Sequence, residues 1–168
     1  GKTVQALAVL TARADEGPAL VVAPTSVMYN WLRDGERFAP GLEPRLYHGP
    51  GRTLEGLGPR AVVVTSYGVL LRDIEALAGV RFSTLVLDEA QALKTASSQT
   101  AKAARSLSSA FTLALTGTPV ENHAGELWSL FEVLAPGLLG TRRSFKARFG
   151  ATRDGEEDAT RRRRLARA

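Results

Sequence analysis

Short runs of apolar residues alternate with segments of helical spacing along this chain, and this alternation limits the folds that it can adopt. Strand-like runs occupy 19–23, 45–48, 61–65, 84–87 and 111–116, whereas helical spacing marks 4–14, 26–38, 67–77, 97–107 and 126–134. Strands that are apolar on both faces and are joined through helices are typical of a parallel sheet covered by helices on both sides. The sequence therefore predicts an α/β fold.

Polar residues follow four of these strands. They form the segments 24–26, 65–67, 88–91 and 116–119, which carry hydroxyl, acidic or amide side chains. The carboxyl ends of parallel strands lie along one edge of a sheet, where α/β proteins bind their ligands. We therefore expect these four segments to meet in one site.

The amino-acid composition excludes several classes of protein. The chain has 168 residues, of which 44% are hydrophobic, and this is enough for one core. Because it contains no cysteine, neither a disulfide framework nor a thiolate metal site is expected. The two histidines, His48 and His123, are far apart in sequence, so a histidine metal cluster is not expected either. No apolar run is long enough to cross a bilayer, and we expect no membrane partner.

The net charge of +5 comes from the end of the chain. Arginines occupy 161–164 and 167, and without them the basic and acidic residues balance. Net charge is therefore no evidence for nucleic-acid binding, and any nucleic-acid surface must be local. We expect residues 1–150 to form one domain and 151–168 to be a charged, arginine-rich tail.

The chain opens on Gly1-Lys2-Thr3, which are the last three residues of the phosphate-loop pattern G-x-x-x-x-G-K-S/T. In that pattern, backbone amides at a helix start hold phosphate oxygens, the lysine neutralises them and the hydroxyl ligates Mg²⁺. The first glycine and the four variable residues of the pattern are not part of this sequence, which starts at the second glycine, Gly1. The tripeptide alone is a weak signal, and its alternative is a helix start that binds nothing.

Asp88 and Glu89 stand side by side at the end of the apolar run 84–87. Adjacent carboxylates are costly at such a place unless a cation or a reaction requires them. In phosphate-loop ATPases, a carboxylate at a strand end holds Mg²⁺ and a second acid orients the attacking water. The alternative is a pair of turn or helix-capping acids, which the opening Gly1-Lys2-Thr3 makes less favoured.

These motifs together resemble helicase superfamily two, and more narrowly the Swi/Snf-type DNA translocase ATPases. The DEAQ box at 88–91 and the segment 115–122 carry the wider resemblance, and 126–129 with 136–140 carry the narrower one. The matching stretches follow the family's order over most of 1–150: 1–10, 21–40, 47–49, 62–73, 85–94, 113–140 and 144–149. Thr95 departs from the asparagine that is usual there. The resemblance implies a RecA-like lobe of three layers, of the P-loop NTPase type but truncated at its phosphate loop.

The resemblance also implies a role for each matched residue. Glu89 would activate water, and Asp88 and Lys2 would act with it in catalysis. Gly1, Lys2, Thr3 and Gln91 would bind ATP, while Thr3 and Asp88 would ligate Mg²⁺. Thr116, Gly117 and Thr118 would couple the state of ATP to DNA movement. Contacts to DNA phosphates would come from Pro24, Thr25, Ser26, Thr65, Ser66 and Tyr67, through hydroxyls and backbone amides that read no sequence.

By the same resemblance, the protein would be an ATP hydrolase that tracks along double-stranded DNA and remodels protein–DNA complexes, generally without unwinding strands. ATP binding would close two lobes around the DNA, and hydrolysis would reopen them. The cofactors would be ATP and Mg²⁺. The partners would be the backbone of duplex DNA and a DNA-bound target, such as RNA polymerase or another complex. We expect a cytoplasmic location in a bacterium, or a nuclear one in a eukaryote.

Several parts of that family are not found in these residues. They are the upstream glutamine segment, half of the phosphate loop and the second RecA-like lobe with its arginine finger, so 151–168 is expected to begin the linker to that lobe. Loss of an arginine finger costs about a thousandfold or more in related ATPases. We therefore expect this fragment alone to hydrolyse ATP poorly or not at all.

Two other functions remain open on the sequence alone. The chain could belong to an RNA helicase or a restriction-type DNA motor of the same superfamily, against which the block 126–140 argues. It could also be a non-hydrolysing lobe that binds DNA or protein, against which the intact segments 88–91 and 116–118 argue.

Single residues have simpler interpretations too. Trp31 and Trp128 are more typical of packing than of base stacking. Ser26 and Thr65 could cap the helices that follow them. Lys94 could be an ordinary surface lysine.

Overall fold

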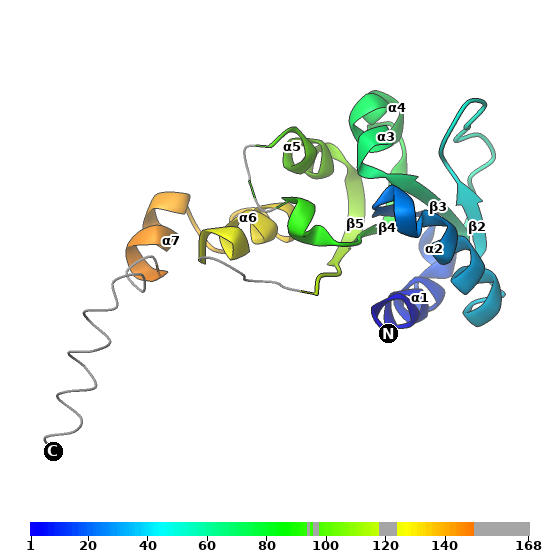
Figure 1. Cartoon of the computed structure of the whole chain (residues 1–168), viewed down its shortest axis with the longest axis horizontal. Helices are drawn as coiled ribbons and strands as arrows, with labels where there is room; N and C mark the ends of the chain where they lie inside the picture. The colour runs from blue at the N-terminus through cyan, green and yellow to red at the C-terminus, as the bar shows by residue number, and fades with distance from the viewer. Residues whose placement is uncertain (94, 96–97, 118–123, 150–168) are drawn as a thin grey trace, which may run out of the picture.

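Among the residues that the structure describes, five parallel strands form one central sheet (Figure 1). This computed structural model describes residues 1–93, 95, 98–117 and 124–149. The strands are β1 (Ala19–Ala23), β2 (Glu43–Leu46), β3 (Ala61–Ser66), β4 (Arg81–Leu87) and β5 (Ser108–Ala114). They lie in the order β2-β3-β1-β4-β5, and each neighbouring pair is parallel. The predicted α/β fold is therefore confirmed, while the predicted tail 151–168 lies outside the described residues.

Helices cover both faces of this sheet. They are α1 (Lys2–Ala12), α2 (Thr25–Phe38), α3 (Tyr67–Arg72), α4 (Ile74–Ala78), α5 (Gln99–Ser106), α6 (Ala124–Leu134) and α7 (Arg142–Phe149), with 3₁₀ helices at Ala14–Glu16 and Ala90–Leu93. Helices α1 and α2 pack on one face, and α3 to α6 pack on the other (Figure 1). No helix in the described part of the chain is long and apolar enough to cross a membrane.

The central strand β1 separates two hydrophobic cores. All of its residues are buried, as expected for a strand with helices on both sides. Because side chains alternate along a strand, Leu20 and Val22 pack with α3 to α6, whereas Val21 packs with α1 and α2. Burying one such side chain stabilises the fold by about 1.5–3 kcal/mol. The two cores therefore hold the ends of β1, β3 and β4 in a fixed register.

Several predicted boundaries are wrong, among them that of the strand predicted at 84–87, which is β4 and begins at Arg81. The predicted helix 67–77 is two helices, because Asp73 adopts a φ of −113° and a ψ of 27° between α3 and α4. The strand predicted at 45–48 is Glu43–Leu46, since the Glu43 N–H donates to the Arg60 carbonyl and begins the pairing with β3. The strand predicted at 111–116 is β5, which starts three residues earlier because it pairs with β4 from Arg81 onward. Helix α7 was not predicted as an element.

A long-range ion pair fixes the break between α3 and α4. The guanidinium of Arg52, in the loop between β2 and β3, makes two contacts with the Asp73 carboxylate, one of them 2.8 Å long. Arg52 also donates to the Gly49 carbonyl at 2.7 Å and lies 5.8 Å from the centre of the Tyr47 ring. The pair ties the β2–β3 loop to the α3–α4 junction. Hydrogen bonding from Arg52 lowers the pKa of Asp73.

We expect Asp73→Asn to destabilise the chain at neutral pH and to have less effect in acid. Because the folded-state pKa of Asp73 is lowered, the stability from this pair is present above the unfolded pKa, about 3.9. It is lost as the pH falls through the lowered folded-state pKa. Thermal unfolding followed by circular dichroism at about pH 7 and about pH 2 would measure this, with Glu55→Gln, at an exposed carboxylate of the β2–β3 loop, as control. An equal fall in melting temperature at both pH values would contradict this account.

Candidate functional site

The carboxylate of Asp88 is held from two sides at the carboxyl end of β4. Its backbone N–H donates to the Val22 carbonyl at 2.8 Å, which extends the pairing of β1 and β4. Its Oδ1 accepts from the Glu89 N–H at 2.9 Å, and its Oδ2 accepts from Nε1 of Trp31 at 2.9 Å. Asp88 is only 8% exposed, so these bonds offset the cost of burying it. A carboxylate offers about four lone-pair sites, which leaves room for a cation.

Glu89 turns the chain out of the sheet. Its φ of +48° lies in the left-handed region, which costs a residue with a Cβ about 1–2 kcal/mol. Strain of this kind clusters at functional sites. The Glu89 side chain is 39% exposed, and its Oε1 lies 3.8 Å from Nζ of Lys2. The turn therefore separates the two adjacent acids, with Asp88 buried and Glu89 facing outward beside a cation.

A chain of side-chain hydrogen bonds runs from the end of β4 to the end of β5. Nε2 of Gln91 donates to Oε2 of Glu89 at 2.6 Å, and Oγ1 of Thr116 donates to Oε1 of Gln91 at 3.0 Å. The backbone runs alongside, since the Ala90 N–H donates to the Leu115 carbonyl at 2.9 Å. The structure thus joins the predicted acidic pair to the predicted coupling segment.

Helix α1 presents its first turn to the same edge of the sheet. Nζ of Lys2 reaches Glu89, and a Cβ added at Gly117 would lie 3.6 Å from that nitrogen. No side chain caps this turn and it contains no acidic residue. Its free N–H groups and the helix dipole therefore favour an anion. Gly1 is exposed and Thr3 is half-buried beside them.

The segment Pro24-Thr25-Ser26 lies at the start of α2. Thr25 and Ser26 are exposed, Pro24 is half-buried, and no side chain caps the first turn of the helix. The alternative prediction that Ser26 is a helix cap is therefore wrong. The exposed hydroxyls and uncapped amides are open to a phosphate, which is compatible with the predicted DNA contact.

Thr65 and Ser66 point into the protein. Thr65 is fully buried, and its hydroxyl donates to the Tyr47 carbonyl at 2.8 Å. It therefore does not cap α3, as one interpretation of the sequence proposed. That role belongs to Ser66, which is 5% exposed and whose hydroxyl accepts from the Val69 N–H at 3.2 Å. Both hydroxyls serve the fold here, and their predicted contact with DNA stays a prediction.

Tyr67 also points inward, toward the acidic pair. Its hydroxyl donates to the backbone carbonyl of Asp88 at 2.8 Å. Burial, and then the charges of Asp88 and Glu89, raise the pKa of Tyr67 far above its ordinary value. The hydroxyl therefore keeps its proton and remains a donor. A contact between this side chain and DNA likewise stays a prediction.

A family model described as the SNF2-related domain matches residues 1–168. The chain belongs to this family. One relative is YwqA of Bacillus subtilis (strain 168), whose name places it provisionally among ATP-dependent helicases or translocases. It is 40% identical over an alignment of 159 residues, which covers 89% of this chain and 17% of that protein. The TATA-binding protein-associated factor mot1 of Schizosaccharomyces pombe is 36% identical over 155 residues, 88% of this chain and 8% of that protein. The SNF2-related chain thus spans less than a fifth of each relative.

A solved structure shows the same likeness in three dimensions. The Sulfolobus solfataricus SWI2/SNF2 ATPase core in complex with dsDNA has a TM-score of 0.79 with this chain at 40% sequence identity. The match covers 89% of this chain and 32% of that one. The predicted RecA-like architecture of the SNF2-related domain is therefore confirmed.

The oxygen atoms at this edge of the SNF2-related domain fit a Mg²⁺ ion that arrives with a nucleotide. Mg²⁺ prefers oxygen ligands and is usually held by one or two protein groups together with phosphates and water. Asp88 supplies a carboxylate that is already oriented, and Thr3 supplies a hydroxyl in the first turn of α1. Within the described ranges, no group of three or more His, Cys, Asp or Glu side chains could hold a metal ion. A metal here would therefore need phosphate or water ligands as well.

The sequence did not reveal the two contacts that Trp31 and Tyr67 make with Asp88. Trp31 is 2% exposed and packs in the core with α1 and α2, so its prediction as a packing residue is confirmed. A general signal exists, because a buried tryptophan N–H needs an acceptor, but no spacing pattern shows which acceptor it finds. Thr118, predicted to act in coupling, and Lys94 lie outside the described residues.

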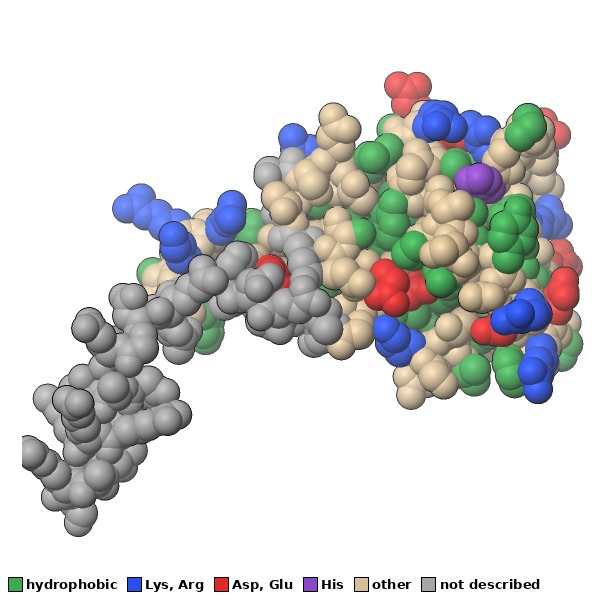
Figure 2. All heavy atoms as spheres, viewed as in Figure 1, with side chains coloured by type: hydrophobic (Ala, Val, Ile, Leu, Met, Phe, Trp, Pro, Cys, Tyr) green, Lys and Arg blue, Asp and Glu red, His purple; other side chains and the backbone are tan. Residues whose placement is uncertain are grey.

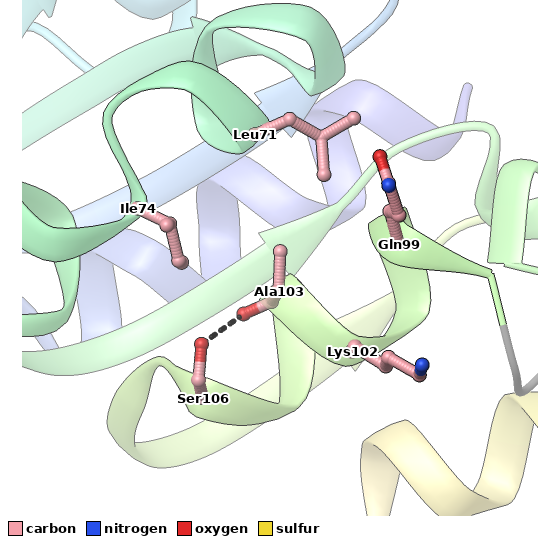
Figure 3. A pocket seen from close by; sticks show the side chains of 6 residues that line it. All are labelled: Leu71, Ile74, Gln99, Lys102, Ala103 and Ser106. Atoms are coloured by element: carbon pink, nitrogen blue, oxygen red, sulfur yellow. Dashed lines mark hydrogen bonds between the residues drawn. The ribbon is translucent and has the colours of Figure 1, made fainter.

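A separate hollow of about 430 Å³ lies between α3, α4 and α5 (Figure 3). The side chains that line it are Leu71, Ile74, Gln99, Lys102, Ala103 and Ser106. None of them is a predicted site residue, and the hydrogen bond drawn there, from the Ser106 hydroxyl to the Ala103 carbonyl, is local to α5. This hollow is therefore distinct from the site at the sheet edge.

Surface charge is mixed on the face that Figure 2 shows. Basic and acidic side chains of the described residues are interspersed over the sheet and its helices. Basic side chains gather over α7, where Arg142, Arg143, Lys146 and Arg148 are exposed. A nucleic-acid surface on this domain must therefore be built from particular elements and not from its net charge.

Proposed function

We propose that this chain is the N-terminal ATP-binding lobe of a motor that uses ATP hydrolysis to move along double-stranded DNA and to remodel protein–DNA complexes. The observation that carries the proposal is the connected site at the sheet edge, where Asp88, Glu89 and Gln91 meet Thr116 and Lys2. Membership of the SNF2-related domain family supports the reaction class.

The nucleotide phosphates would lie at the first turn of α1. Lys2 and Glu89 are 43% and 39% exposed in their side chains, and exposed ion pairs contribute only about 0–1 kcal/mol. A phosphate group can therefore replace Glu89 as the ion-pair partner of Lys2 at a small cost in free energy. Thr3 and Asp88 would hold Mg²⁺, which supplies positive charge against the phosphate oxygens when it is bound.

Glu89 would take the proton of the attacking water. Gln91 already occupies its Oε2, so Oε1 is the oxygen left to accept a proton once Lys2 turns to the phosphates. A general base must lie within hydrogen-bond reach of that water, and the exposed side chain of Glu89 can move to it. The hydrogen bond between Gln91 and Thr116 would then transmit the cleavage of the γ-phosphate to the end of β5.

Duplex DNA would bind across the starts of α2 and α3. The exposed hydroxyls of Thr25 and Ser26 and the uncapped amides of α2 suit phosphate oxygens, which carry no sequence information. The solved ATPase core in complex with dsDNA supports this partner. The target would be a DNA-bound protein such as RNA polymerase or another complex, in keeping with a relative that is named for its association with the TATA-binding protein.

ATP hydrolysis by the complete gene product tests the proposal, with duplex DNA, single-stranded DNA, RNA or no nucleic acid added. We expect duplex DNA to stimulate phosphate release most strongly. Stimulation by RNA or by single strands instead would place the protein among the other motors of the superfamily. Absence of turnover under all four conditions would favour a lobe that only binds.

A further inference from the structure

Two side chains from neighbouring helices form hydrogen bonds with Asp88 at the end of β4. The indole N–H of Trp31, in α2, donates to its carboxylate, and the hydroxyl of Tyr67, the first residue of α3, donates to its backbone carbonyl. Asp88 thus has one contact from each helix whose start carries a predicted DNA segment. Neither contact belongs to the Glu89–Gln91–Thr116 chain.

The contact with Trp31 is well placed to fix the carboxylate. The donor and acceptor are both buried, at 2% and 8% exposed, so water does not compete for the bond. The other carboxylate oxygen is held by the Glu89 N–H. Donors of this kind orient metal ligands, and their loss typically lowers metal affinity by about 10–100-fold.

The contact with Tyr67 fixes the backbone at the same residue. The strand pairing of Asp88 to Val22 holds its N–H, and Tyr67 holds its carbonyl. The position of Asp88 is therefore set jointly by β1, α2 and α3.

We propose that Trp31 and Tyr67 are positioning residues that set Asp88 for its metal, and that Trp31 also transmits DNA binding at the exposed start of α2 to the nucleotide site. A helix moves largely as a rigid element, and a hydrogen bond weakens steeply when its angle or length departs from the ideal. A small displacement of α2 by a DNA phosphate at Thr25 and Ser26 therefore changes the bond from Trp31 to Asp88. This inference rests on the proposed function, because it assigns Asp88 to Mg²⁺ and the start of α2 to DNA.

The test uses Trp31→Phe and Tyr67→Phe in the complete gene product, with Trp128→Phe as the matched control. The indole of Trp128 also donates one hydrogen bond, but to the Gly140 carbonyl, at 3.0 Å, and not to Asp88. The readout is binding of a fluorescent ADP analogue without hydrolysis, titrated with Mg²⁺ and repeated with saturating duplex DNA. Melting temperatures identify any variant that is merely unfolded.

We expect Trp31→Phe to raise the Mg²⁺ concentration at half-maximal nucleotide binding by about tenfold. Tyr67→Phe, which removes one hydroxyl and leaves the ring in place, should raise it by about threefold to fivefold. Trp31→Phe should also reduce the effect of DNA on nucleotide affinity, whereas Trp128→Phe should change neither quantity.

The inference would be overturned if Trp31→Phe and Tyr67→Phe both fold and both keep the Mg²⁺ midpoint and the DNA effect of the parent protein. Both residues would then have only a packing role. If Trp31→Phe does not fold, Tyr67→Phe decides alone. If the parent protein itself shows no Mg²⁺-dependent nucleotide binding or no response to DNA, the proposed function fails first, and this inference fails with it.

Discussion

Glu89→Gln is expected to lower ATP turnover by the complete gene product by at least about a hundredfold, because a positioned general base contributes about 10²–10⁴-fold. An amide cannot take the proton of the attacking water. It does keep an oxygen that can accept the hydrogen bond from Gln91, so the local structure is expected to survive. Removing a negative charge beside Lys2 should leave nucleotide binding intact or slightly tighter.

Steady-state phosphate release, with and without duplex DNA, measures the loss, and binding of a fluorescent nucleotide analogue shows that the site is still formed. Glu55→Gln is the matched control, because Glu55 is exposed in the β2–β3 loop. Turnover within about threefold of the parent would remove Glu89 from the catalytic role, since a general base contributes far more.

Gln91→Ala is expected to uncouple the two halves of the site. Gln91 is the middle member of the chain from Glu89 to Thr116, and truncation breaks both hydrogen bonds. Coupling between two sites typically changes affinity or response by about 5–150-fold. We therefore expect stimulation of hydrolysis by duplex DNA to fall about tenfold or more, while nucleotide affinity without DNA changes by less than about threefold.

Thr116→Val breaks only the second of these bonds and should act in the same direction with a smaller effect. Gln99→Ala is the control, because Gln99 is exposed at the start of α5. An unchanged DNA stimulation with a large fall in nucleotide affinity would mean that Gln91 only binds the nucleotide.

The strands 19–23 and 61–65 could be predicted because residues buried on both faces leave an unbroken apolar run. The geometry of parallel sheets also predicted that the polar segments after the strands would lie at one edge, and three of the four do make contact there, since Tyr67 donates to Asp88 and Thr116 donates to Gln91. These features depend on local pattern and on the general geometry of parallel sheets.

Features set by long-range contacts could not be predicted. The break at Asp73 depends on Arg52, 21 residues earlier, and the orientation of Asp88 depends on Trp31, 57 residues earlier. The inward turn of Thr65 depends on the Tyr47 carbonyl in the neighbouring segment after β2. Residue spacing predicts which face a side chain takes, but it does not show which distant partner it will find there.

Displacement of a third strand from a DNA triplex by the complete gene product tests the central claim most directly, since it detects movement along a duplex. A flanking duplex gives the motor its track, and release of the labelled third strand reports its arrival. We predict release that requires both ATP and the flanking duplex, is lost in Glu89→Gln, and leaves the underlying duplex paired. DNA-stimulated hydrolysis with no release above the ATP-free rate, or separation of the duplex itself, would contradict a duplex translocase.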